Sequence, residues 1–168
     1  MKKEIYLAGG CFWGVQKYFG LLPGVLATEV GYANGQGENP TYEQVYTGES
    51  GFAETLRLVY DGERIDLDFI LEQFAKIIDP TTLNRQAADV GSHYRTGVYY
   101  TNSHDKEIIA KFLTDLQKEY ADPIVVENQP LTVFYKAEER HQDYLKKNPG
   151  GYCHIPEVKY REARNIKL

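Results

Sequence analysis

Hydrophobic residues recur along the chain with two different spacings, one typical of strands and the other of helices. Apolar residues at every second position predict strands, and apolar residues spaced by three or four predict amphipathic helices. The predicted strands cover residues 3–8, 25–32, 53–60, 94–100, 125–126 and 131–135. The predicted helices cover residues 12–22, 41–46, 67–78, 105–120 and 138–147, with Asp66 as the N-cap of the third.

This order of elements predicts an α+β fold. We expect a two-layer α/β sandwich with a mixed, mostly antiparallel sheet and a ferredoxin-like split βαβ core. At 168 residues the chain suits one domain, residues 1–168. Residues 148–168 lack periodicity and are expected to form an irregular tail.

Composition and charge exclude several classes of function. The net charge is −5, and no basic run exceeds Lys146-Lys147, so a general nucleic-acid binder is not expected. The apolar segments are much shorter than a membrane span, and residues 1–11 fit a first strand better than a signal peptide, so we expect a cytoplasmic protein. Two cysteines in that compartment suggest catalysis or metal binding before a structural disulfide.

Residues 8–14, Ala-Gly-Gly-Cys-Phe-Trp-Gly, carry the most chemical information. Cys11 is expected to open the first helix, where backbone N–H groups and the helix dipole favour a thiolate. Lowering the pKa of the thiol towards ~7 would ionise about half of it at neutral pH. The alternative is that Cys11 is a small buried hydrophobe and that Phe12 and Trp13 belong to the core.

Two further groups could act with Cys11. Cys153 lies in a glycine-rich segment, where a second thiol could form a disulfide with an oxidised Cys11 or remain an idle tail thiol. Glu54 follows small residues at the start of a predicted strand. Burial there would raise its pKa and let it donate a proton near neutral pH, whereas an exposed position would leave it a solvated charge.

Other chemistries are open on the residues alone. Any of four histidines, His93, His104, His141 or His154, could serve as base to Cys11 in a cysteine hydrolase. A zinc site from Cys11, Cys153, His141 and His154 lacks paired short spacing and is the weakest alternative. The glycines near Cys11 do not form a dinucleotide-binding fingerprint.

Gly10-Cys11-Phe12-Trp13-Gly14 resembles the signature of the peptide methionine sulfoxide reductase A family, and the resemblance runs along nearly the whole chain. The other matching segments are residues 31–32, 39–42, 51–54, 86–95, 141–145 and 148–153. Several motifs in the same order are more specific than any one of them.

The resemblance implies a role for each matching residue. Cys11 would be the nucleophile and Glu54 the acid, and Tyr42 and Tyr94 would donate hydroxyl hydrogen bonds to the sulfoxide oxygen. The implied substrate-binding residues are Phe12 and Trp13 at the methyl group and Asp89 at the peptide backbone. Cys153 would be the resolving cysteine.

The same resemblance implies reduction of the S epimer of methionine sulfoxide, in oxidised proteins and peptides or as the free amino acid. Thioredoxin would be the external reductant and partner, and no cofactor or metal is required. Nothing in the sequence suggests an obligate partner subunit, so we expect a monomer. The family commonly has histidine where Phe52 stands and Thr-Gln where Ser92-His93 stand, which affects the surroundings of Glu54 and Tyr94.

Two rival functions remain to be distinguished. A thiol peroxidase could use the same two cysteines, but it would consume peroxide and need no aromatic pair for a methyl group. A peptide-binding module with an aromatic pocket would keep its function in Cys11→Ser.

Overall fold

The computed structural model describes residues 1–168 and shows a mixed α/β fold built on a six-stranded sheet. In sheet order the strands are β7 (Glu127–Pro130), β6 (Thr96–Tyr100), β1 (Lys2–Gly9), β3 (Ala53–Asp61), β2 (Val25–Ala33) and β8 (Phe134–Lys136). The strands β4 (Arg85–Gln86) and β5 (Asp89–Val90) form a separate hairpin. The helices are α1 (Phe12–Gly20), α2 (Tyr42–Tyr46), α3 (Leu67–Ala75), α4 (Ser103–Gln117), α5 (Tyr144–Lys147) and α6 (Glu157–Arg164).

The sheet is mixed and mostly antiparallel, as the sequence predicts. Strand β3 lies between β1 and β2 and is antiparallel to both, while helix α1 connects β1 to β2. Strand β6 adds antiparallel to β1, and only the β6–β7 pair is parallel. The ferredoxin-like description of the central strands stays a prediction, because two edge strands, a hairpin and further helices are added to them.

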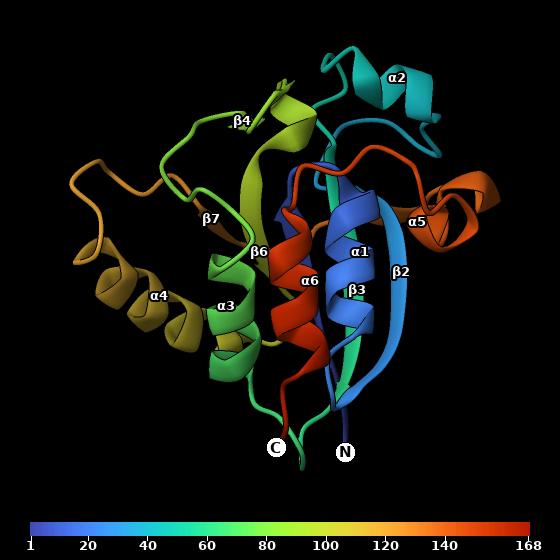
Figure 1. Cartoon of the computed structure of the whole chain (residues 1–168). Helices are drawn as coiled ribbons and strands as arrows, with labels where there is room; N and C mark the ends of the chain where they lie inside the picture. The colour runs from blue at the N-terminus through green and yellow to red at the C-terminus, as the bar shows by residue number, and fades with distance from the viewer.

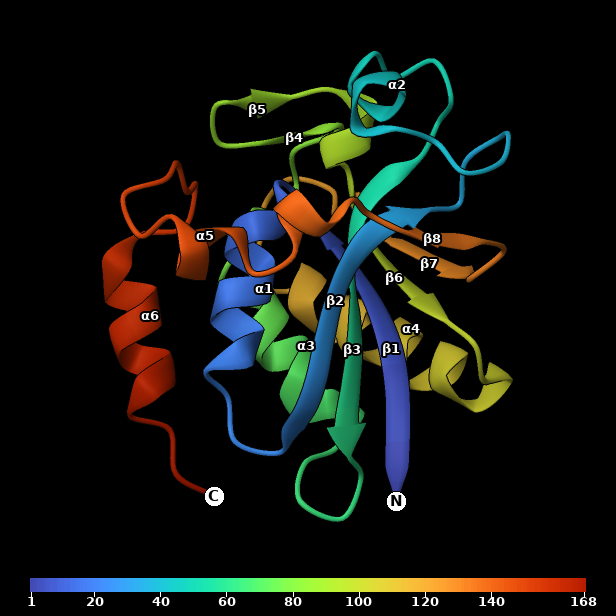
Figure 2. The ribbon, with the colours of Figure 1, turned by 90° about the vertical axis from the view of Figure 1, so that its right-hand side faces the viewer.

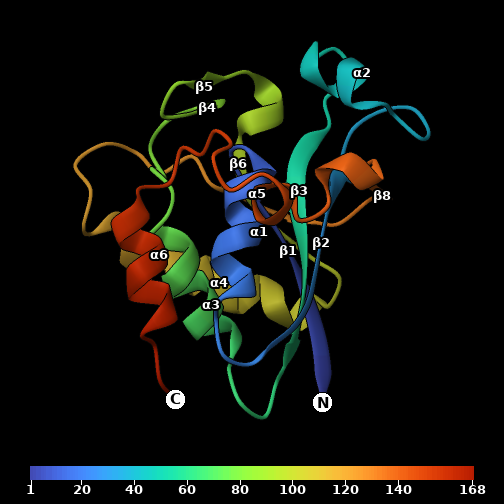
Figure 3. The same ribbon diagram turned by 45° about the vertical axis from the view of Figure 1, so that its right-hand side comes forward.

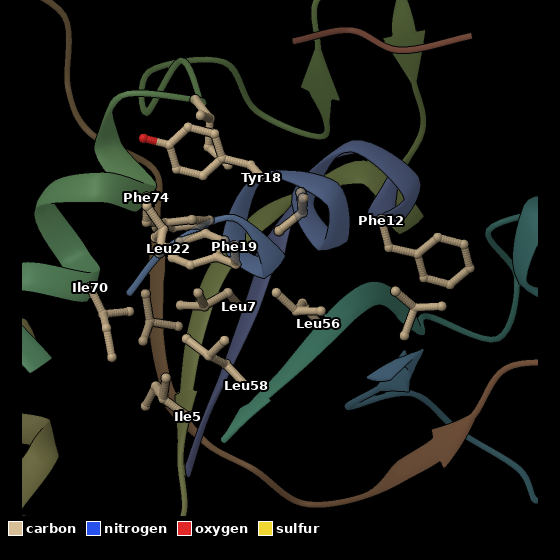
Figure 4. Packing of buried hydrophobic residues seen from close by; sticks show 14 of the residues in the cluster. Ile5, Leu7, Phe12, Tyr18, Phe19, Leu22, Leu56, Leu58, Ile70 and Phe74 are labelled. Atoms are coloured by element: carbon tan, nitrogen blue, oxygen red, sulfur yellow. The ribbon is translucent and has the colours of Figure 1, made fainter. Parts of the chain in front are cut away.

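Helices α1, α3 and α6 lie on one face of the sheet (Figure 2). Apolar side chains from α1 and α3 face those of β1 and β3 and form the main core (Figure 4), which includes Phe19, Phe74, Leu7 and Leu58. The predicted N-cap is confirmed, since Asp66 accepts a hydrogen bond from the backbone N–H of Phe69. The longest helix, α4, has 15 residues, and no helix is long and apolar enough to cross a membrane.

The carboxyl end of β1 meets the amino ends of β3 and β6 at one end of the sheet. The register fixes this meeting, because Leu7 pairs with Leu56 and Gly9 pairs with Thr96. The α2 segment and the β4–β5 hairpin lie at that same end, and both termini lie at the opposite end (Figures 1 and 2). Residues that follow β1 or precede β3 and β6 are therefore gathered in one place.

The boundaries of three predicted strands are wrong. Residues 92–94 form a 3₁₀ turn, so β6 begins at Thr96. The two strands expected at 125–126 and 131–135 are β7 and β8, displaced towards the C-terminus. Short strands at the edge of a sheet have little periodic signal, which explains the displacement.

The prediction of an irregular tail over residues 148–168 is also wrong in part. Residues 157–164 form helix α6, which packs against α1 (Figures 1 and 3). Within the helix only Tyr160 and Ala163 are buried, and their spacing of three is too little to stand out as a periodic pattern. Packing of this narrow face, rather than intrinsic propensity, stabilises a helix of eight residues.

Gln142 joins the segment before α5 to the sheet. Its side-chain oxygen accepts a hydrogen bond from the Val30 N–H at 3.0 Å, and its amide nitrogen donates to the carbonyls of Val30 and Ala137. Val30 is fully buried, so water does not readily replace this partner.

We expect Gln142→Ala to lower the free energy of unfolding by about 1–3 kcal/mol, because a buried backbone N–H loses its acceptor. Urea denaturation of the variant and of the exposed control Gln129→Ala measures the difference. Equal stability of the two variants would show that the amide does not support the fold.

Candidate active site

Cys11 stands between β1 and α1 as the N-cap residue of the helix, as predicted. The preceding Gly10 has φ of +84°, and a Cβ atom there would lie 2.8 Å from the Cβ of Gln86. Glycine is therefore needed both for the left-handed backbone and for the close approach of the 81–91 loop. Only 6% of Cys11 is exposed, so the thiol faces an enclosed space.

The expectation that the helix terminus lowers the pKa of Cys11 is wrong for this resting structure. Burial and the nearby Glu54 carboxyl group raise the pKa of the thiol well above its usual range, and Asp89 adds to the effect. The backbone N–H of Trp13 favours the thiolate, but it is outweighed. At neutral pH the free protein therefore carries a protonated thiol.

Glu54 projects from β3 into the same enclosed space. Its side chain is 1% exposed, and burial raises its pKa to about 8, in the direction that the sequence predicts for a buried glutamate. One carboxyl oxygen, Oε1, accepts a hydrogen bond from the Phe12 N–H at 3.2 Å, whereas Oε2 is buried without a partner. A protonated Oε2 would be a hydrogen-bond donor free to bind an added acceptor.

Two phenol groups complete this side of the site. Burial and the neighbouring Glu54 carboxylate raise the pKa of Tyr42 to about 12 and raise that of Tyr94 further. Cys11 contributes to both shifts, so the two phenols are close enough to the thiol and to the carboxyl group to feel their charge. Both hydroxyls stay protonated at neutral pH and can donate hydrogen bonds.

Tyr42 is placed by contacts at the start of α2. Thr41 and Gln44 form a capping box, and Glu138 accepts hydrogen bonds from the Tyr42 N–H at 3.0 Å and the Tyr32 hydroxyl at 2.8 Å. Tyr94 ends the 3₁₀ turn before β6, with the ring of His93 3.9 Å from its own. The family-atypical His93 is thus a direct neighbour of one of the phenols, whereas Phe52 packs against Tyr135.

Phe12 and Trp13 occupy different depths. Phe12 is 1% exposed and packs against Tyr32, so it belongs to the core at the base of the site. The ring of Trp13 stacks on Tyr144 at 3.7 Å, and its indole N–H donates to His141 Nδ1 at 3.1 Å. A cleft of about 470 Å³ is lined by Trp13, Tyr42, Glu43, Tyr46, Arg140, His141 and Tyr144. This aromatic cleft opens beside the buried thiol.

Asp89 lies in β5 and faces the tail. Its Oδ2 atom is buried without a hydrogen bond and lies 3.8 Å from His154 Nδ1. Burial lowers the pKa of His154, so the imidazole is neutral at pH 7 and the pair is not a charged bridge. Burial and the same carboxylate raise the pKa of Tyr152 to about 12. The residues on both sides of Cys153 therefore lie near Asp89.

The two cysteines are both free thiols in this structure. Cys153 packs on the first turn of α1, where a Cβ atom on Gly14 would lie 2.9 Å from its Sγ. Gly14 follows Cys11 by three positions. Cys153 therefore packs on α1 close to Cys11, although 142 positions separate the two cysteines in the sequence (153 − 11).

The histidine alternatives gain no support from these contacts. None of the hydrogen bonds of His93, His104, His141 or His154 reaches Cys11, and His104 lies on the distant helix α4. His141 receives the Trp13 N–H and stacks among aromatic rings. The residues considered for a zinc site form no group of three or more that could hold a metal ion, so the zinc alternative gains no support either.

His141 and Tyr144 shape the aromatic cleft, a role that the sequence did not indicate for either, since His141 was a candidate only as base or zinc ligand. Both lie about 130 positions after Trp13 (141 − 13 = 128), so no local pattern signals the contact. Their place in the matching segment 141–145 was the available signal.

Comparison with known proteins identifies close relatives. Residues 3–167 match the family model described as peptide methionine sulfoxide reductase. The chain is 50% identical to the peptide methionine sulfoxide reductase MsrA of Lachnoclostridium phytofermentans over 98% of this chain and 99% of that protein.

Solved structures give the same likeness. Reduced Mxr1 from Saccharomyces cerevisiae is 36% identical, with a TM-score of 0.88 over 92% of this chain and 91% of that one. Mxr1 in complex with Trx2 is 27% identical, with a TM-score of 0.62 over 85% and 84% of the two chains.

The electrostatic link between Glu54 and Cys11 can be tested by alkylation. In a Cys153→Ser background we expect Glu54→Gln to lower the pKa of Cys11, because the amide removes the carboxylate that opposes the thiolate. Iodoacetamide should then modify Cys11 several-fold faster at pH 9, where the carboxylate is ionised in the parent. Glu43→Gln, on the outer rim of the cleft, is the matched control. Equal rates in all three proteins would show that the two groups are not coupled.

Proposed function

Because the chain belongs to the peptide methionine sulfoxide reductase family, it reduces methionine sulfoxide to methionine, and we propose that Cys11 is the nucleophile in this reaction. The thiol is buried at the head of α1, beside the aromatic cleft and three hydroxyl or carboxyl donors. Tyr42 and Tyr94 are the two hydroxyl donors, and Glu54 is the acid.

The unpartnered Oε2 atom of Glu54 is the observation that carries this assignment. A buried polar atom without a partner is costly, and a sulfoxide oxygen is an acceptor that would satisfy it. A sulfoxide sulfur is a poor electrophile until its oxygen is protonated or strongly hydrogen-bonded. A neutral carboxylic acid and two protonated phenols supply that polarisation opposite a thiol.

The proton inventory follows from the two raised pKa values. At neutral pH Glu54 and Cys11 both enter the reaction protonated. Glu54 gives its proton to the sulfoxide oxygen, the sulfur of Cys11 attacks, and the carboxylate receives the thiol proton. The thiol becomes a sulfenic acid as the oxygen is transferred, and the substrate sulfur is reduced by two electrons to the thioether.

Substrate recognition uses the cleft and the hairpin. Phe12 forms the base and Trp13 the wall of an apolar site for the methyl group of the sulfoxide side chain. Asp89 supplies a carboxylate for backbone N–H groups of a peptide substrate, and its buried Oδ2 is unpartnered. The substrates are oxidised proteins and peptides or free methionine sulfoxide.

Cys153 is the resolving cysteine in this proposal. Its thiol condenses with the sulfenic acid of Cys11, forms a disulfide and releases water, and thioredoxin then reduces the disulfide. The packing of Cys153 against Gly14 supports the short path between the sulfurs, and the complex of the similar Mxr1 with Trx2 supports the reductant.

The enzyme selects the S epimer, requires no cofactor or metal, and works as a cytoplasmic monomer in which residues 1–168 form one catalytic domain. The split βαβ arrangement of β1, α1, β2 and β3 supports the ferredoxin-like core proposed for that domain.

A single-turnover assay tests the function. The reduced protein is mixed with the separated S and R epimers of a methionine sulfoxide peptide, and methionine and free thiols are counted. We expect one methionine from the S epimer alone with loss of both thiols, and no reaction of Cys11→Ser. Reduction of neither epimer, together with thiol loss under peroxide, would favour a thiol peroxidase.

The pH dependence of the first turnover tests the role of Glu54. Because its pKa is about 8, the proton needed by the sulfoxide oxygen is present below pH 8 and lost above it. We expect the rate of methionine formation to fall between pH 8 and 9.5 in the parent protein. Glu54→Gln should be slower by about 10²-fold or more at pH 7 and lack this fall. A parent rate that rises across this range would contradict the acid role.

A further inference from the structure

We infer that Tyr160 of α6 is a positioning residue for the resolving step, whose hydroxyl orients the sulfur of Cys153 towards Cys11. The inference rests on the proposed function and extends it to a residue in the tail helix. Tyr160 has no contact with the aromatic cleft or with Glu54, so it acts through Cys153.

The hydroxyl oxygen of Tyr160 lies 2.7 Å from Cys153 Sγ. The backbone N–H of Ile155 also points to this sulfur, at 3.3 Å. The Ile155 carbonyl oxygen lies 3.6 Å from the same sulfur, so the Tyr160 hydroxyl and both polar backbone groups of Ile155 together fix its position. The Tyr160 ring is buried with 2% exposure, which fixes its orientation.

The same hydroxyl has a second partner, the Gly14 carbonyl oxygen at 3.5 Å. While Cys153 is a thiol, its S–H can donate to the Tyr160 oxygen and the hydroxyl can donate to Gly14. When the sulfur is ionised, the O–H rotates to donate to it instead. One phenol therefore serves both protonation states of Cys153 without moving its ring.

Cys153 and Tyr160 both pack against helix α1 at Gly14. Gly14 follows Cys11 by three positions. A Cβ atom at Gly14 would approach Cys153 Sγ at 2.9 Å and Tyr160 Oη at 3.2 Å, so the absent side chain provides the space that both occupy. The pair is thereby held against the helix that presents the other sulfur.

A cation lies close to the Tyr160 ring. The ammonium group of Lys17 lies 4.2 Å from the centre of the Tyr160 ring, and it follows Gly14 by three positions on α1. Burial and the bond to Cys153 keep Tyr160 protonated by raising its pKa. The other titratable groups that act on it are Glu157 and Cys11.

The step that Tyr160 assists is balanced without an added oxidant. The sulfur of Cys153 attacks the sulfur of the Cys11 sulfenic acid, so an S–S bond forms and the S–O bond breaks. The oxygen leaves as hydroxide and takes the thiol proton to become water. Tyr160 donates a hydrogen bond to the attacking sulfur and is unchanged at the end.

Tyr160→Phe tests the inference, because it removes the hydroxyl and keeps the ring. Tyr18→Phe is the matched control, since Tyr18 is equally buried and its hydroxyl bonds Gln73 rather than a cysteine. Rapid quenching of a single turnover measures methionine and the disulfide separately, and dimedone traps any Cys11 sulfenic acid.

In Tyr160→Phe we expect unchanged formation of methionine and at least a tenfold slower formation of the disulfide, with trapped sulfenic acid. Tyr18→Phe should match the parent in both steps. A parent-like disulfide rate in Tyr160→Phe, or equal slowing of both steps, would overturn the inference. Absence of methionine from the parent protein would instead reject the proposed function.

Gly14→Ala provides a second, independent change. The added methyl group meets Cys153 Sγ and Tyr160 Oη, so it should displace the pair and slow disulfide formation more than methionine formation. If Gly14→Ala leaves disulfide formation as fast as in the parent, the close packing against α1 is not what directs the sulfur.

Discussion

The site depends on keeping the carboxyl group of Glu54 neutral in a buried space beside a thiol. A pKa of about 8, compared with 4.5 for a free glutamate, corresponds to roughly 5 kcal/mol favouring the neutral form. Between these two values the folded chain holds a proton that the unfolded chain releases, so stability from this group falls as the pH rises. The surrounding fold must offset that cost, and the central strands with their large apolar core do so.

The same burial explains why several distant segments converge on this end of the sheet. Glu54 lies on β3 and Cys11 follows the adjacent strand β1, but the phenols come from α2 and from the turn before β6, and Asp89 comes from a separate hairpin. Each segment closes part of the space and excludes water. Glu138 links this closure to the sheet, because one carboxylate accepts hydrogen bonds from the Tyr32 hydroxyl of β2 and the Tyr42 N–H of α2.

Much of this arrangement could be predicted from the sequence. Periodicity predicted the elements, and motifs predicted the site residues. Periodicity located β1, β2, β3, α1 and α3, because each buries an apolar face against the core. It could not locate α6, whose buried face consists of Tyr160 and Ala163. Local sequence context pointed to Cys11, Glu54 and Cys153 as candidates. Tyr42, Asp89 and Tyr94 came from the motif resemblance, since nothing local links them. The prediction of a lowered pKa for the Cys11 thiol was wrong. A helix terminus can be predicted from a sequence, whereas desolvation and an opposing carboxylate depend on how the chain packs.

The two sulfur atoms differ in their access to solvent. Cys11 is 6% exposed beneath the cleft, whereas Cys153 is partly exposed at the surface of α1. The rate of thiol–disulfide exchange depends on which sulfur an attacking thiolate can reach. An external dithiol that reduces a Cys11–Cys153 disulfide is therefore expected to attack Cys153 and to release Cys11 as the leaving group. Cys11 would then take up a proton in its buried position, which returns the protonated thiol and carboxyl pair from which the next turnover begins.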